Sequence, residues 1–137
     1  MIKSPSVFSI IAVFLFGCSI IGNDSPTSPR ISVAPSTIQV GQEIEISIRP
    51  TSETRIPYCS GFVYAIEKLE SDEWQFFDAD FKACSGLFPD YLISRPITIK
   101  HTITEAGTFR FASSYRFNTD DVFKPLYSKN FSVELPK

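Results

Sequence analysis

Few residues of this chain have side chains that could do chemistry. The sequence holds three cysteines, Cys18, Cys59 and Cys84, and a single histidine, His101. A Ser–His–Asp site needs a nucleophile held on a sharp turn beside its base, and no Gly-x-Ser-x-Gly segment occurs in the sequence. His101 lies among isoleucines, which predicts a strand-face side chain that makes an ordinary hydrogen bond. We therefore expect no catalytic residue and no enzyme activity, and turnover that depends on His101 would contradict this.

The sequence predicts no metal site and no cofactor. Zinc needs several His or Cys ligands, and calcium needs six to eight oxygen ligands. The carboxylates that could gather at loops show no EF-hand spacing, and we interpret them as solvated loop residues. They are Asp78, Asp80, Asp90, Asp120 and Asp121.

Charge gives no reason to expect nucleic acid or an anionic membrane surface as a partner. The formal net charge is −2, whereas proteins that bind such surfaces by charge carry a basic excess. Arg110, Arg116 and Lys100 would form a basic face on neighbouring strands, and we interpret them as ordinary outer sheet surface.

Cys18 stands at the end of a short targeting segment. Lys3 supplies a positive charge, and residues 7–16 are nearly all apolar. This run is shorter than the roughly 20 residues of a membrane-spanning helix but suits a signal peptide. The residues Leu15-Phe16-Gly17-Cys18 resemble a bacterial lipobox, which implies cleavage before Cys18 and lipidation of its thiol. The alternatives are an ordinary signal peptide with an unmodified cysteine and a membrane anchor that stays uncut.

The lipobox resemblance implies a place for the protein in the cell. Residues 1–17 would be the signal peptide, and the acyl chains on Cys18, of which stable anchoring needs two or more, would hold the protein in a membrane. Ser19 stands where an Asp would imply retention in the inner membrane, so the outer membrane is implied if the host is Gram-negative. Residues 18–30 are rich in turn formers and predict a flexible tether with a reach of about 20 Å.

Cys59 and Cys84 remain as a possible pair. Outside the cytosol an even number of cysteines favours a disulfide, whereas reduced buried thiols would be favoured if the chain stayed in the cytosol. A tight hairpin that pairs Leu69 with Trp74 would, in unbroken register, also place Cys59 opposite Cys84. A bulge near residues 78–80 would change that register without forbidding the bond.

The rest of the chain predicts short strands and no helix. Residues 43–49 alternate most cleanly, with three isoleucines on one face and charged or polar side chains on the other. His101 shares a row with the isoleucines of its strand, and residues 131, 133 and 135 of the last strand are expected to point inward. Residues 51–57, 85–91 and 118–125 are predicted as loops. The predicted strands are residues 31–33 and 37–40 (one strand split at Pro35), 43–49, 62–69, 74–77, 96–103, 108–117 and 127–135.

Seven or eight short strands at regular spacing predict an all-β fold, a β-sandwich. Residues 35–42, 67–74 and 105–111 resemble segments of the bacterial Ig-like domains found on exported lipoproteins. The resemblance implies that residues 31–137 form one immunoglobulin-like β-sandwich of antiparallel strands.

A rigid sandwich commonly carries function on its loops. We expect a non-catalytic domain that binds an envelope protein or glycan, through a sheet edge or through residues 51–58, 85–91 and 118–126. An alternative is a small Ig-like protease inhibitor that inserts residues 85–91 into an active-site cleft. The candidate contact residues are aromatic side chains that would otherwise cap the sandwich: Tyr58, Phe88, Tyr91 and Tyr127.

Overall fold

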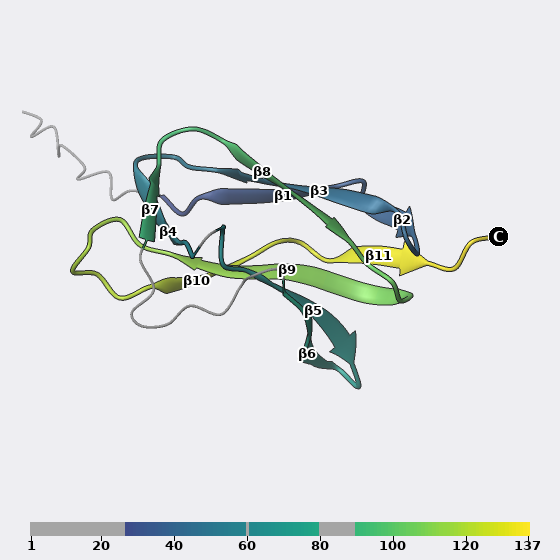
Figure 1. Cartoon of the computed structure of the whole chain (residues 1–137). Helices are drawn as coiled ribbons and strands as arrows, with labels where there is room; N and C mark the ends of the chain where they lie inside the picture. Colours follow the sequence, from purple (N-terminus) through teal and green to yellow (C-terminus); the bar gives the residue numbers. More distant parts are fainter. Residues whose placement is uncertain (1–26, 60, 80–89) are drawn as a thin grey trace, which may run out of the picture.

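The alternating segment forms the middle strand of a three-stranded sheet. Strand β3 (Glu43–Arg49) pairs antiparallel with β1 (Arg30–Ala34) on one side and with β8 (Ile97–Thr102) on the other. Ile44, Ile46 and Ile48 are fully buried, because alternate side chains of a strand share one face. The structure, a computed structural model drawn in Figure 1, describes residues 27–59, 61–79 and 90–137.

A second, larger sheet faces the first. Its strands follow the order β2, β11, β9, β5, β6, and β10 also pairs with β9. A separate two-stranded sheet, of β4 and β7, lies at one end of the molecule (Figure 1). The strand bounds are β2 Thr37–Gln39, β4 Thr54–Pro57, β5 Ala65–Glu70, β6 Glu73–Asp78, β7 Asp90–Ile93, β9 Gly107–Tyr115, β10 Lys124–Tyr127 and β11 Phe131–Glu134.

The hydrophobic core fills the space between the two large sheets, which form the two layers of Figure 1. The isoleucines of β3 come from one sheet, and Phe109 and Phe111 of β9 come from the other, each fully buried. The all-β prediction is therefore confirmed, and the arrangement is that of a β-sandwich. The described residues form eleven strands rather than seven or eight, and one pair, β2 with β11, is parallel.

Pro35 divides the first strand between the two sheets, as predicted. Residues before it pair with β3, and residues after it pair in parallel with β11. Proline suits such a switch because it lacks the N–H that a continuous ladder would need. Ser32 and Thr37 thus belong to different layers although they are close in sequence.

The hairpin of β5 and β6 has the predicted register from Glu70↔Glu73 to Glu67↔Phe76. Ser71 and Asp72 have φ values of 50° and 64°, as a two-residue type I′ turn requires, and Leu69 lies opposite Trp74. The register then shifts between Ile66 and Glu67.

Because of this shift, an unbroken ladder does not extend from the hairpin to Cys59. β5 itself begins only at Ala65, and the Cys59 backbone N–H donates instead to the Gly61 carbonyl over 2.7 Å. The unbroken register that would place Cys59 opposite Cys84 is therefore absent from the described residues, and the shift lies next to residues 78–80, where a bulge was considered. Cys84 and Cys18 lie outside the described residues, so the disulfide and the lipidation remain predictions.

The predicted loop at residues 51–57 is partly a strand. β4 pairs with β7 over four residue pairs, Thr54↔Ile93 to Pro57↔Asp90, and its Thr54 and Ile56 side chains are fully buried. The prediction was wrong because the polar composition of this segment hides a strand that its distant partner stabilises. The same pairing takes residues 90 and 91 into β7, at the end of the predicted loop 85–91.

The predicted last strand, residues 127–135, is divided. β10 and β11 both pair with β9, and Ser128 bridges the gap between them: its Oγ accepts from the Phe111 N–H over 2.9 Å. Phe131 and Val133 point inward as predicted, but Leu135 is 70% exposed. That last prediction was wrong because β11 ends at Glu134, so the inward–outward alternation of the strand does not continue to Leu135.

Candidate functional site

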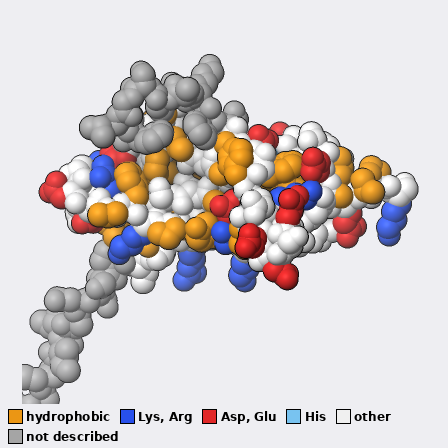
Figure 2. All heavy atoms as spheres, turned by 90° about the horizontal axis from the view of Figure 1, so that it is seen from below, with side chains coloured by type: hydrophobic (Ala, Val, Ile, Leu, Met, Phe, Trp, Pro, Cys, Tyr) orange, Lys and Arg blue, Asp and Glu red, His pale blue; other side chains and the backbone are white. Residues whose placement is uncertain are grey.

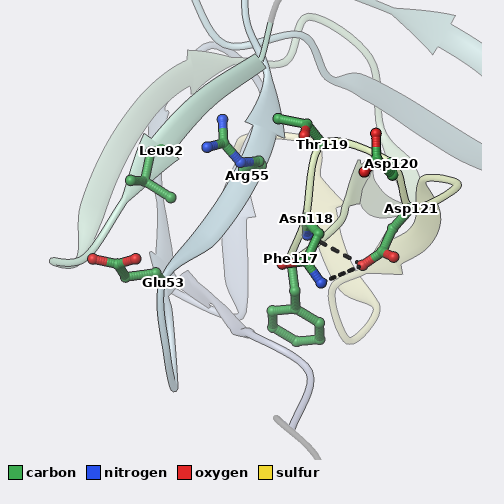
Figure 3. A pocket seen from close by; sticks show the side chains of 8 residues that line it. All are labelled: Glu53, Arg55, Leu92, Phe117, Asn118, Thr119, Asp120 and Asp121. Atoms are coloured by element: carbon green, nitrogen blue, oxygen red, sulfur yellow. Dashed lines mark hydrogen bonds between the residues drawn. The ribbon is translucent and has the colours of Figure 1, made fainter.

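Two of the three predicted binding segments meet at one end of the sandwich. A pocket of about 460 Å³ lies between the start of β4, the edge strand β7 and the segment that follows β9 (Figure 3). Its walls carry carboxylates, an amide, a hydroxyl and an arginine beside two apolar side chains, so it can hydrogen-bond a polar ligand and also contact its apolar parts. The lining residues are Glu53, Arg55, Leu92, Phe117, Asn118, Thr119, Asp120 and Asp121.

A tight turn shapes the wall formed by residues 117–121. The Asp121 carboxylate accepts hydrogen bonds from the Asn118 N–H at 3.1 Å and from its Nδ2 at 3.2 Å, drawn as dashed lines in Figure 3. Asn and Asp stabilise turns in this way because their short side chains reach nearby backbone groups. Arg116 holds the same turn from behind, since its Nη1 donates to the Thr119 carbonyl over 2.7 Å.

A charged cluster ties the pocket's elements together. Asp90 on β7 accepts from Arg116 Nε at 2.8 Å and Nη2 at 2.6 Å, and from Arg55 Nη1 at 3.0 Å. The side chain of Asp90 is only 9% exposed, so its charge depends on these two partners. Burial by itself acts to raise the pKa of Asp90, but the hydrogen bonds and charges of Arg116 and Arg55 outweigh it and hold that pKa below its ordinary value.

Asp90 also reduces the charge repulsion between Arg55 and Arg116. The backbones of Arg55 and Arg116 pair directly, N–H to carbonyl, over 2.7 and 3.0 Å. Like charges opposite each other destabilise a sheet, and the carboxylate between them neutralises that repulsion. This cluster was not predicted from the sequence, because Asp90 was interpreted as a solvated loop residue and Arg116 as outer sheet surface.

The structure brings Tyr58 and Tyr91 together, as candidate contact residues, beside Phe62. The ring centroids of Tyr58 lie 5.3 Å from Tyr91 and 5.4 Å from Phe62. Tyr91 is 52% exposed, so the cluster offers a contact surface at the same β4–β7 end as the pocket. Phe88 lies outside the described residues.

Tyr127 belongs to a different surface. It lies on β10, 48% exposed, with its ring 3.9 Å from the guanidinium carbon of Arg110. The four predicted contact residues therefore do not form one site.

His101 is buried between the sheets and makes two hydrogen bonds. Its Nδ1 lies 2.9 Å from the Tyr64 hydroxyl, and its Nε2 lies 3.0 Å from the Asp78 carboxylate. The three side chains link β8 to the β5–β6 hairpin. This is the hydrogen-bonded strand-face histidine that the sequence indicated.

Within the described ranges, no group of three or more His, Cys, Asp or Glu side chains is placed to hold a metal ion. Nor does this part of the chain contain a helix long and apolar enough to span a bilayer.

Comparison with known proteins adds no identity. No protein-family model matches this chain, and no curated protein matches it significantly.

Proposed function

We propose that this protein is an envelope lipoprotein, anchored through Cys18, whose immunoglobulin-like domain is a non-catalytic binding module for a protein or a glycan. The observation that carries the proposal is the convergence of predicted binding segments on one pocket, with Glu53, Arg55 and residues 117–121 on its walls. The volume of this pocket lies within the range of ligand sites, and its largely polar walls suit a polar ligand.

The immunoglobulin-like assignment rests on topology. The first strand is shared between two sheets, its second half runs parallel to the last strand, and β9 lies between that last strand and β5. Sandwiches of this family divide their strands between two facing sheets in a comparable way. We propose the Cys59–Cys84 disulfide alongside it, on the even cysteine count in an exported chain.

The contacts made by residues 27 and 28 indicate which end of the domain the tether joins. Thr51 donates its hydroxyl to the Thr27 carbonyl, and the Ser28 and Tyr115 hydroxyls lie 2.9 Å apart. The domain's contacts thus begin before the expected boundary at residue 31, and they lie near the pocket end. With Cys18 lipidated, a short tether would hold this end toward the membrane, and the ligand would be membrane-proximal.

Two measurements test the proposal. The intact mass of the protein from the membrane fraction, taken before and after reduction under alkylation, should show a species that begins at Cys18 with lipid mass. It should gain two alkyl groups only after reduction. A species with an unmodified Cys18, or one whose Cys59 and Cys84 are alkylated without reduction, would remove the anchor or the disulfide from the proposal.

The site is tested by photocrosslinking in cells. A benzoylphenylalanine at Leu92, which lines the pocket, should capture one discrete envelope component. The matched control at Leu135, 70% exposed beyond the end of β11, should not capture it. An identical adduct pattern from both positions, or none from Leu92, would reject the pocket as the binding site.

A further inference from the structure

An arginine on the outer face of the larger sheet is held between two aromatic rings. The guanidinium carbon of Arg110 on β9 lies 4.4 Å from the ring centroid of Trp74 on β6 and 3.9 Å from that of Tyr127 on β10. Guanidinium groups stack on aromatic rings in this way because the ring faces are electron-rich. We call these three side chains, with Glu67, the Arg110 stack.

A hydrogen bond to Glu67 further restricts the orientation of the Arg110 guanidinium. The Glu67 carboxylate accepts from Arg110 Nε at 2.5 Å, and the two side chains are 23% and 19% exposed. Within the described part of the chain, neither terminal nitrogen of Arg110 donates a hydrogen bond. The guanidinium is therefore oriented on three sides, while its terminal pair of nitrogens remains available to a ligand.

Such a pair of nitrogens matches a carboxylate. Guanidinium and carboxylate form two parallel hydrogen bonds, with higher strength and geometric specificity than a neutral contact. Because the rings and Glu67 already hold Arg110, a ligand would lose little side-chain entropy on binding it.

The surroundings of the stack suit a sugar ring. Phe76 lies directly opposite Glu67 on β6, so it shares the outer face, and it is 69% exposed. Figure 2 shows hydrophobic side chains spread over this side of the molecule among many charged ones of both signs. Aromatic rings with exposed faces can pack against the C–H groups of a sugar ring, while the fork of Arg110 binds its carboxylate.

Other occupants fit less well. A peptide that extended the sheet would hydrogen-bond the backbone of an edge strand, whereas Arg110 projects from β9, an inner strand of the sheet. A second copy paired antiparallel through the middle of β6 would place Glu73 opposite Asp78, and like charges opposite each other are unfavourable.

We propose that the Arg110 stack is a binding site for a carboxylate-bearing sugar, of the sialic or uronic acid class. Arg110 would bind the carboxylate, and Trp74, Tyr127 and Phe76 would contact the sugar ring. This site shares no residue with the pocket lined by Glu53, Arg55 and residues 117–121. Its test is therefore independent of the test of the proposed function.

The only tryptophan of the chain lies in this site, so its fluorescence reports binding. The mature protein is titrated with the methyl glycosides of N-acetylneuraminic acid and of glucuronic acid, up to about 20 mM because a shallow site binds weakly. At least one should change the Trp74 fluorescence saturably, and the methyl ester of the same sugar should bind at least about tenfold more weakly.

Three variants test the roles. Arg110→Gln should weaken binding by at least about tenfold, and Arg110→Lys by several-fold, since an ammonium lacks the fork. Glu67→Gln should tighten binding a few-fold, because it keeps an acceptor for Nε while removing a carboxylate that repels the ligand. If Glu67 only held Arg110 in place, the same substitution should weaken binding instead. Arg49→Gln, at an exposed arginine of the other sheet, is the matched control and should change binding by less than about twofold.

Urea unfolding of each variant shows whether it is folded. If Arg110→Gln does not fold, Arg110→Lys is used in its place to test the role of the guanidinium. Any of three results would reject the proposal. The Trp74 fluorescence could show no saturable change with either sugar, the methyl ester could bind as tightly as the free acid, or a folded Arg110 variant could keep the wild-type affinity. Tighter binding of an acidic peptide such as acetyl-Gly-Asp-Glu-amide would assign the site to protein rather than to sugar.

Discussion

Two arginines of the same part of the chain are held by different interactions. Arg116, directly after β9, donates to Asp90 through two nitrogens and to the Thr119 carbonyl through a third. Among the described residues, the side chain of Arg110, within β9, makes one hydrogen bond, to Glu67, and its guanidinium lies against the rings of Trp74 and Tyr127.

This difference separates a structural role from a recognition role. The nitrogens of Arg116 are committed to the protein itself, and they join β7 and the 117–121 turn to the sheet. Arg110 is positioned through its ring contacts, which leave its terminal nitrogens able to donate hydrogen bonds at the surface. Substitution should therefore affect stability at one arginine and ligand binding at the other.

The largest stability effect should come from Arg116→Leu. It would leave Asp90 buried with Arg55 as its single partner and would release the pocket turn, and breaking a buried ion pair costs about 3 kcal/mol or more. Urea unfolding followed by circular dichroism measures the loss. A cost below about 1 kcal/mol, as expected of an exposed pair, would mean that the cluster is not a structural anchor.

Asp90→Asn should cost about 2 kcal/mol at neutral pH, because the three charge-assisted hydrogen bonds to Arg116 and Arg55 weaken and the arginines then repel each other. The folded pKa of Asp90 is lowered, so its contribution is present above the unfolded pKa of about 3.9 and is lost as pH falls through the folded pKa. The gap in unfolding free energy between wild type and Asp90→Asn should be constant from about pH 7 to 5 and shrink below about pH 4. A gap that widened in acid would contradict the direction of the pKa shift.

Arg110→Leu should cost about 1 to 2 kcal/mol, since each of its two ring contacts is worth about 0.5 to 1 kcal/mol. The cost should be smaller than for Arg116→Leu because the carboxylate left behind, Glu67, is 23% exposed, whereas Asp90 is 9% exposed. The same urea series used for Arg116→Leu provides the measurement, with Arg49→Gln as the control. A loss as large as that of Arg116→Leu would make Arg110 a structural residue and remove the contrast.

The smallest effect should come from Phe123→Leu. The Phe123 ring centroid lies 4.4 Å from the guanidinium carbon of Arg116, but hydrogen bonds already hold that arginine, so the cost should stay below about 1 kcal/mol. Tyr127→Leu makes the matching change beside Arg110. It should alter the Trp74 emission at a comparably small cost, whereas Phe123→Leu should leave that emission unchanged.

The parts of the fold that could be predicted are those whose signal is local. The alternation of residues 43–49 predicted β3, and Pro35 predicted the split of the first strand. The hairpin at Ser71 and Asp72 followed from a short polar turn between two apolar runs. In each case the residues that determine the structure are neighbours in sequence.

The candidate site was predicted only in outline. Segments 51–58 and 118–126 were expected to bind, and both contribute to the pocket, but β4 was missed and Asp90 was taken as solvated. Tyr127 was selected as a contact residue, whereas its partner Arg110 was interpreted as ordinary surface. Nothing in the local pattern marks these pairings, since their members are far apart in the chain.

The sequence by itself determined the all-β class, the alternating faces of the strands and the main turns, because backbone preference and hydrophobic period act over a few residues. Only the tertiary structure decided that Arg116 shares Asp90 with Arg55, and that Arg110 lies between Trp74 and Tyr127. Sheet pairing brings distant residues into contact, and the same residue type becomes a structural anchor or a surface ligand group according to the neighbours it meets there.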